Sequence, residues 1–208
     1  MSVTVEWLGH ASFKISDGIT LYIDPWKIAD AAHDGDLVLI SHDHFDHYVA
    51  EDIAKVARGD TVIVATADVV AKHGSGQAIK PGQTTEVGPA TITATAAYNI
   101  GKEFHPQDNE WVGFIIEISG RRIYYAGDTD QISEMDQVKD IDLALVPVGG
   151  TYTMTGVEAA SAVNQLKPRQ ALPYHWGDIV GTRIDAEVLA DHAQCNVEIL
   201  EPGQSLTV

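Results

Sequence analysis

Cysteine and long apolar runs are almost missing from this sequence. Cys195 is the single cysteine among 208 residues, so an internal disulfide is excluded. That scarcity fits a reducing compartment, and we expect a cytoplasmic protein. No apolar stretch approaches the roughly 20 residues that a transmembrane helix requires. Residues 1–6 also lack the basic start and apolar centre of a signal peptide.

Basic residues are scarce as well. The 13 lysines and arginines face 30 aspartates and glutamates, which gives a net charge of −17. Proteins that bind nucleic acids usually carry a basic face, because phosphate contacts supply most of their affinity. The pair Arg121-Arg122 is the nearest approach to a basic cluster here. A nucleic-acid partner is therefore disfavoured, a small-molecule substrate is expected, and the sequence leaves the oligomeric state open.

Hydrophobic residues make up 45% of the chain, which is enough for a substantial core. Their alternation and the turn signals predict strands and helices in two similar sets. The expected strands cover residues 3–8, 12–15, 19–23, 37–40, 61–65, 90–95, 112–118, 122–126, 142–147, 171–173 and 197–200. The expected helices cover residues 51–57, 67–72, 155–166 and 185–192. This order predicts a layered α/β sandwich in a single domain spanning residues 1–208.

Metal-binding side chains crowd into one short segment, Ile40-Ser41-His42-Asp43-His44-Phe45-Asp46-His47-Tyr48. It follows an apolar run at residues 37–40, which is typical of a strand covered on both faces. Imidazole and carboxylate groups are ligands that Zn²⁺, Mn²⁺ and iron accept. The spacing His-x-His-x-Asp-His suits a cradle for two metals. An exposed polar loop with chance histidines is the alternative, but three of the nine histidines within six positions favour metal binding.

Three isolated residues follow other predicted strands. Asp128, after Ala126-Gly127, could bridge two cations, although an aspartate there more often caps the next segment. His175 ends the run that leads through Pro173-Tyr174, where a lone histidine is more often structural. Asp24 precedes Pro25, and a turn residue is its simplest interpretation.

Six stretches of the sequence together resemble the metallo-β-lactamase superfamily of metal-dependent hydrolases. They are Trp7-Leu8-Gly9-His10-Ala11-Ser12, Asp24-Pro25, Ser41 to His47, Ala126-Gly127-Asp128-Thr129, Gly149-Gly150-Thr151-Tyr152-Thr153-Met154 and Pro173-Tyr174-His175. Within this superfamily, residues 7–11 and 151–154 point to the branch of L-ascorbate-6-phosphate lactonases and N-acylphosphatidylethanolamine phospholipase D. The resemblance implies a four-layer αββα sandwich with two divalent metal ions, zinc first and manganese or iron as alternatives.

The resemblance also implies which residues hold the metals. His42 and His44 would bind the first metal. Asp46, His47 and His175 would bind the second, and Asp128 would bridge the two.

The third ligand of the first metal departs from the family pattern. The family usually has a histidine where this chain has Asn99, and an amide oxygen is a poor zinc ligand. His105, six residues later, could replace it. The alternative is a loop histidine held by Pro106, and the sequence leaves both interpretations open.

The expected chemistry is hydrolysis of an ester, lactone or phosphoester by a metal-activated hydroxide. Asp46 would act as the catalytic residue by orienting the nucleophile and passing a proton to the leaving group. His10 could reach the rim of the site, although a structural hydrogen bond is the simpler interpretation, and Tyr152 and Met154 could line the substrate mouth or belong to the core. The rival functions are a phosphodiesterase or nuclease of the same superfamily, and a non-catalytic metal-binding or sensing protein.

Overall fold

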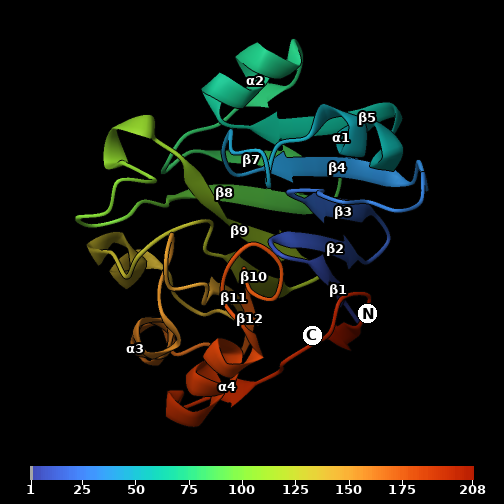
Figure 1. Ribbon diagram of the computed structural model, residues 1–208. Coiled ribbons are helices and arrows are strands. Elements are labelled where there is room, and N and C mark those ends of the chain that lie inside the picture. The colour runs from blue at the N-terminus through green and yellow to red at the C-terminus, as the bar shows by residue number, and fades with distance from the viewer. Residues whose placement is uncertain (1) are drawn as a thin grey trace.

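Two facing β-sheets with helices on their outer sides form the protein in a computed structural model that describes residues 2–208 (Figure 1). Helices α1 (Ala50–Val56) and α2 (Ala67–His73) pack on strand β5 of the first sheet. Helices α3 (Gly156–Leu166) and α4 (Arg183–His192) pack on strands β11 and β12 of the second sheet. The layers therefore follow the order αββα that the family resemblance implies.

Each sheet has seven strands. The first has the order β14-β1-β2-β3-β4-β5-β6, with β14 (Ser205–Thr207), β1 (Thr4–Gly9), β2 (Ser12–Ser16), β3 (Thr20–Ile23), β4 (Gly35–Ile40), β5 (Ala57–Ala65) and β6 (Gln77–Ala78). The second has the order β13-β12-β11-β10-β9-β8-β7, with β13 (Asn196–Val197), β12 (Gln170–Tyr174), β11 (Leu143–Pro147), β10 (Arg121–Tyr125), β9 (Val112–Ile118), β8 (Ala90–Ala96) and β7 (Thr84–Val87).

Strand β4 shows why an unbroken apolar run suits this position. Leu37 and Leu39 point into the core between the sheets, whereas Val38 and Ile40 point into a second apolar cluster. That second cluster includes Ile53 of α1 and lies under the helices on the outer face. Because alternate side chains leave opposite faces of a strand, a strand buried on both faces must be apolar at every position. The run therefore places the end of β4 firmly, and the histidine-rich segment follows it.

The start of α3 also follows from a local signal. The Thr155 side chain accepts a hydrogen bond from the Glu158 backbone amide, and the Glu158 carboxylate accepts one from the Thr155 amide at 2.7 Å. This reciprocal pair is a capping box, which satisfies amides that lack partners inside the helix. Thr182 and Asp185 form a second capping box, so α4 begins at Arg183, two residues before the expected start.

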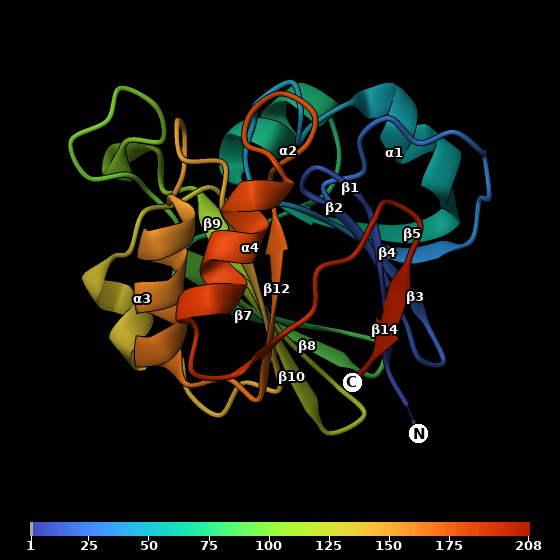
Figure 2. The same cartoon turned by 60° about the horizontal axis from the view of Figure 1, so that its bottom comes forward.

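The last strand is the main error of the sequence-based prediction. Residues 197–200 were expected to form it, but β13 is confined to Asn196–Val197 at the edge of the second sheet. The chain then returns to the first sheet, where β14 pairs antiparallel with β1 and Val5 faces Leu206. The Val208 amide donates a hydrogen bond to the Val3 carbonyl oxygen at 2.9 Å, so the start and the end of the described chain lie close together (Figure 2). The short strands β6 and β7 were also not predicted, because edge strands this short carry little alternation.

Among residues 2–208, no helix has the length and apolar character needed to cross a membrane.

Candidate metal centre

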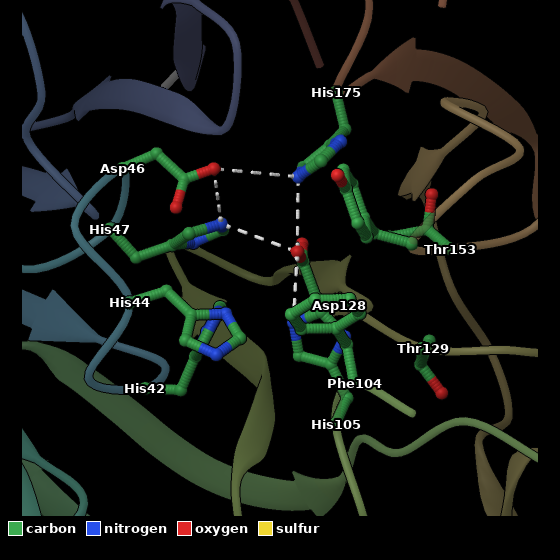
Figure 3. Close-up of polar contacts among 12 residues, drawn as sticks. His42, His44, Asp46, His47, Phe104, His105, Asp128, Thr129, Thr153 and His175 are labelled. Atoms are coloured by element: carbon green, nitrogen blue, oxygen red, sulfur yellow. Dashed lines mark hydrogen bonds and ion pairs between the residues drawn. The ribbon is translucent and has the colours of Figure 1, made fainter. Parts of the chain in front are cut away.

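Four loops meet at one edge of the two sheets. The loop after β4 carries His42, His44, Asp46 and His47, and the loop after β8 carries Asn99 and His105. Asp128 follows β10, and His175 follows β12. Figure 3 shows these histidines and aspartates turned toward one another. Residues far apart in the sequence are thus gathered where the strands end.

Asp128 lies at the centre of this group. Its Oδ2 atom is 3.0 Å from His175 Nε2, 3.3 Å from His105 Nε2 and 3.4 Å from His47 Nε2 (Figure 3). The side chain is almost fully buried. A carboxylate with imidazole nitrogens from three different loops around it is placed to bridge two cations.

The potential ligand atoms form three overlapping groups, each with its atoms within 4.8 Å of one another. The groups are His42, His44 and His105; His10, Asp46, His47 and His175; and His42, His47 and Asp128. The first brings His105 beside His42 and His44, and the second brings His10 to Asp46, His47 and His175. The third links them through Asp128.

His10 is the member of this centre whose role the sequence leaves open. Its Nε2 atom lies 2.9 Å from Asp46 Oδ2, and both side chains are buried. The hydrogen bond favoured from the sequence is therefore present, and its partner is a predicted ligand. His10 follows β1 directly, as His175 follows β12, so its place at a strand end was the available signal.

The backbone at several of these positions adopts the left-handed conformation that favours glycine. The φ angles are +49° at His10, +43° at Asp24, +59° at His105 and +63° at His175. Such conformations cost energy for residues with a Cβ atom and cluster at functional sites. At His10, Asp24 and His175 they turn the chain directly after a strand, and at His105 they turn it within the loop that follows β8.

The unpaired buried atoms show that a metal suits this site. Across residues 2–208, the buried atoms without a hydrogen-bond partner include His47 Nε2, His105 Nε2, His175 Nε2 and Asp128 Oδ1. Buried polar atoms rarely stay unpaired, because each has lost its contact with water. Three imidazole nitrogens that surround the Asp128 carboxylate make a donor set for divalent transition metals. The residues present therefore fit the metal that the family implies.

The charge states of two histidines also suit metal binding. Burial lowers the pKa of His42 well below its usual value, and the nearby His47 lowers it further. Burial and the neighbouring His105 lower the pKa of His44. Both rings are therefore neutral near pH 7, which is the form that binds a metal.

The two aspartates are held as carboxylates. Burial alone would raise the pKa of Asp128, but His175 and His47 hold it well below its usual range. Burial likewise opposes ionisation of Asp46, yet the hydrogen bond with His10 lowers the pKa of Asp46 to about 2. The pKa of His47 is raised well above its usual value, because Asp128 and Asp24 outweigh the effect of burial. A metal that binds here must therefore displace a proton from His47.

Asn99 uses its side-chain amide to hold neighbouring backbone. Its side-chain nitrogen Nδ2 lies 3.0 Å from the Phe104 carbonyl oxygen and 2.6 Å from the Tyr152 carbonyl oxygen. It also lies 3.1 Å from His105 Nδ1. Asn99 thus holds together the base of the loop on which His105 is carried. The tertiary structure brings His105 beside His42 and His44, and its role as a metal ligand stays a prediction.

Asp24 does more than form a turn before Pro25. The fully buried carboxylate accepts hydrogen bonds from the Ser41 amide at 2.7 Å, the Ser41 hydroxyl at 2.5 Å and the Tyr125 hydroxyl at 2.7 Å. Its Oδ2 atom also lies 2.8 Å from His47 Nδ1. A carboxylate at Nδ1 keeps the proton on that nitrogen and leaves Nε2 directed at the centre.

We predict that Asp24→Asn weakens metal binding about 10- to 100-fold, because the amide cannot serve all these donors and His47 loses its fixed orientation. The free energy of unfolding should also fall by roughly 1–3 kcal/mol for each buried donor left unpaired. Competition with a chromophoric chelator and thermal unfolding measure the two effects. Asp60→Asn, at an exposed aspartate, is the control. Unchanged metal affinity in Asp24→Asn would show that His47 needs no such support.

A pocket of about 240 Å³ opens onto the centre. It is lined by His44, Phe45, Asp46, Phe104, His105, Asp128, Tyr152, His175 and Ile179. Tyr152 therefore lines the mouth, as one interpretation of the sequence had it, whereas Met154 is fully buried in the core. Five of the pocket's lining residues, His44, Asp46, His105, Asp128 and His175, are candidate metal ligands, so this pocket has suitable chemistry.

Comparisons with known proteins agree with this geometry. Residues 4–175 match the family described as the Beta-lactamase superfamily domain. A UPF0173 metal-dependent hydrolase of Nitratidesulfovibrio vulgaris Hildenborough is 35% identical over 235 aligned residues, covering 100% of this chain and 96% of the relative. Another, from Thermococcus onnurineus, is 33% identical and covers 98% of this chain and 99% of the relative. 

A solved structure is also similar to this chain in its fold. A protein of Parabacteroides distasonis, provisionally named a metal-dependent hydrolase, has a TM-score of 0.86 and 34% identity, covering 95% of this chain and 92% of that one. In each of these comparisons with individual proteins, the match extends over nearly the whole length of the chain. The chain thus belongs to the UPF0173 metal-dependent hydrolase family of the metallo-β-lactamase superfamily.

Proposed function

We propose that this metal-dependent hydrolase binds two divalent cations and cleaves an ester, lactone or phosphoester bond in a small molecule. One observation carries the proposal: unpaired Nε2 atoms of His47, His105 and His175 surround Asp128 in a buried centre that opens into a pocket. Zinc is the first candidate, and manganese or iron are alternatives, because the donor set is imidazole and carboxylate.

The two cations would divide the ligands between them. His42, His44 and His105 would hold the first, and Asp46, His47 and His175 would hold the second. Asp128 would bridge them, since its carboxylate lies between the two histidine groups. Bound metals of this kind supply a hydroxide nucleophile at neutral pH and polarise the oxygen under attack.

The residues of the chain orient and contain the reaction. Asp46 lines the pocket, and His10 holds its Oδ2 atom at 2.9 Å, so the carboxylate has one fixed orientation. We assign Asp46 the catalytic role of orienting the nucleophile and passing a proton to the leaving group. Tyr152 and Phe104, whose rings pack edge-to-face, line one side of the pocket.

The rival functions have less support. Nothing in the lining of the pocket resembles the lysines and arginines with which nucleases bind a phosphate backbone. A protein that only holds metal does not need a pocket that opens onto the centre, and this chain has one. Membership of the lactonase and phospholipase D branch stays a prediction, as do the substrate and the identity of the metal.

We expect His42→Ala to lose metal and to abolish hydrolysis, because it removes one of the few protein ligands of the first site and metal binding falls by several kcal/mol. Elemental analysis counts the metals per chain. Turnover of p-nitrophenyl acetate, γ-butyrolactone and bis(p-nitrophenyl) phosphate measures the activity. His192→Ala, at an exposed histidine on α4, should leave both unchanged. Full metal content together with full turnover in His42→Ala would overturn the proposal.

A further inference from the structure

The mouth of the pocket is unusually apolar for a surface feature. Three of its lining residues are large hydrophobic side chains in contact with solvent: Phe45 is 70% exposed, Phe104 is 44% exposed and Ile179 is 37% exposed. They come from three separate loops, after β4, β8 and β12. Scattered exposed apolar residues are common, but several around one concave site indicate a surface that a ligand covers.

Neighbouring aromatic rings hold two of these side chains in place. Phe104 packs edge-to-face on Tyr152, with ring centroids 4.9 Å apart and an interplanar angle of 84°. Phe45 packs edge-to-face on Trp26, with centroids 6.5 Å apart. Such pairs favour a defined orientation of the rings. The apolar walls therefore exist before any ligand binds, which reduces the entropy cost of binding.

Positive charge is missing from the same surface. No lysine or arginine lines the pocket in the part of the chain that the structure describes. Lysines beside the pocket loops are paired with aspartates: Lys27 with Asp178 at 2.7 Å, Lys72 with Asp43 at 2.6 Å, and Lys102 with Asp130. Sites that recognise phosphate usually offer arginine or lysine. The pocket therefore has no lysine or arginine to bind an anionic substrate, and bound metals would be its source of positive charge.

We infer that the substrate is an uncharged carboxylic ester or lactone whose acyl part carries a short apolar chain, bound between Phe45, Phe104 and Ile179. The inference rests on the proposed function and narrows its substrate class. Water adds to the acyl carbon, the bond from that carbon to the alkoxy oxygen breaks, and the water proton passes to the departing oxygen. The products are a carboxylic acid and an alcohol, or one hydroxy acid from a lactone. A pocket of about 240 Å³ limits the chain to a few carbons.

The length of the acyl chain provides the test. For the zinc-loaded protein, kcat/KM is expected to rise roughly three- to fourfold for each methylene added from p-nitrophenyl acetate through butyrate to hexanoate. The same order is expected for γ-butyrolactone and γ-caprolactone. Bis(p-nitrophenyl) phosphate should be turned over more slowly than any of the esters.

Matched variants locate the effect. Phe104→Ala and Ile179→Ala should reduce the gain in kcat/KM per added methylene. Hydrolysis of p-nitrophenyl acetate should change less, because its acyl chain barely reaches these apolar side chains. Ile184→Ala alters a side chain that is 68% exposed on α4 and lies outside the pocket lining, so it should retain the full gain. An equal gain in kcat/KM per methylene in all three variants would show that Phe104 and Ile179 do not recognise the acyl chain.

Binding to metal-free protein separates this inference from the proposed function. Hexanamide, an uncharged stand-in for the acyl chain, should give stronger ligand-observed NMR signals than acetamide, and Phe104→Ala should abolish the difference. If no ester, lactone or phosphodiester is hydrolysed, the proposed function fails and the amide comparison still decides the inference. A flat ester series, a preference for the phosphodiester, or equal binding of the two amides would overturn the inference while leaving the hydrolase intact.

Discussion

Asp128→Asn is expected to empty both metal positions and to reduce kcat/KM on the order of a thousandfold or more. Asp128 Oδ2 lies within 3.4 Å of nitrogens from His47, His105 and His175, so one carboxylate serves both groups of ligands. Asparagine has almost the same volume and keeps the packing, but it lacks the negative charge that two adjacent cations require. The loss should therefore be in metal binding rather than in folding.

Elemental analysis after dialysis against equal zinc concentrations tests this expectation, with circular dichroism to confirm that the variant is folded. Asp60→Asn, which changes the same chemical group at an exposed position, should keep its full metal content. Retention of two metals per chain by Asp128→Asn would mean that the carboxylate does not bridge them. Retention of one metal would place Asp128 in a single site.

His105→Ala is expected to empty one metal position and leave the other occupied. His105 belongs to the group with His42 and His44, whereas Asp46, His47 and His175 form a group without it. Its Nε2 atom is buried, unpaired and 3.3 Å from Asp128 Oδ2, as a ligand of the first metal would be. Hydrolysis should fall by two orders of magnitude or more if both metals act on the substrate.

The stoichiometry distinguishes this role from the alternatives. If Asn99 or water completed the first site, His105→Ala would keep both metals, and any loss would appear only in the kinetics. His192→Ala controls for the removal of a histidine as such. The companion variant Asn99→Ala removes the hydrogen bonds to the Phe104 and Tyr152 carbonyl oxygens, so it should weaken the first site without emptying it.

Local patterns in the sequence were sufficient to predict many of the strands and helices of this protein and its candidate metal-binding segment. The apolar run before Ser41 predicts a strand buried on both faces, and the spacing of His42, His44, Asp46 and His47 predicts a metal cradle after it. Thr155 and Glu158 predict the start of a helix. Each of these signals operates within a few residues, because side-chain alternation, helical periodicity and capping are properties of short segments. The order of these segments was enough to predict a layered α/β sandwich, and the family resemblance specified the αββα order of its layers.

Other features depend on the path of loops and the order of strands, which short segments do not encode. The loop from Asn99 to His105 contains no periodic pattern, yet its course decides which side chain joins His42 and His44. The hydrogen bond between His10 and Asp46 and the one between Tyr125 and Asp24 join residues 36 and 101 positions apart. The sequence by itself determined most of the strands and helices and most of the candidate ligands. The tertiary structure decided the surroundings of those ligands, because packing of the two sheets alone brings the strand ends, and the side chains that follow them, to one edge.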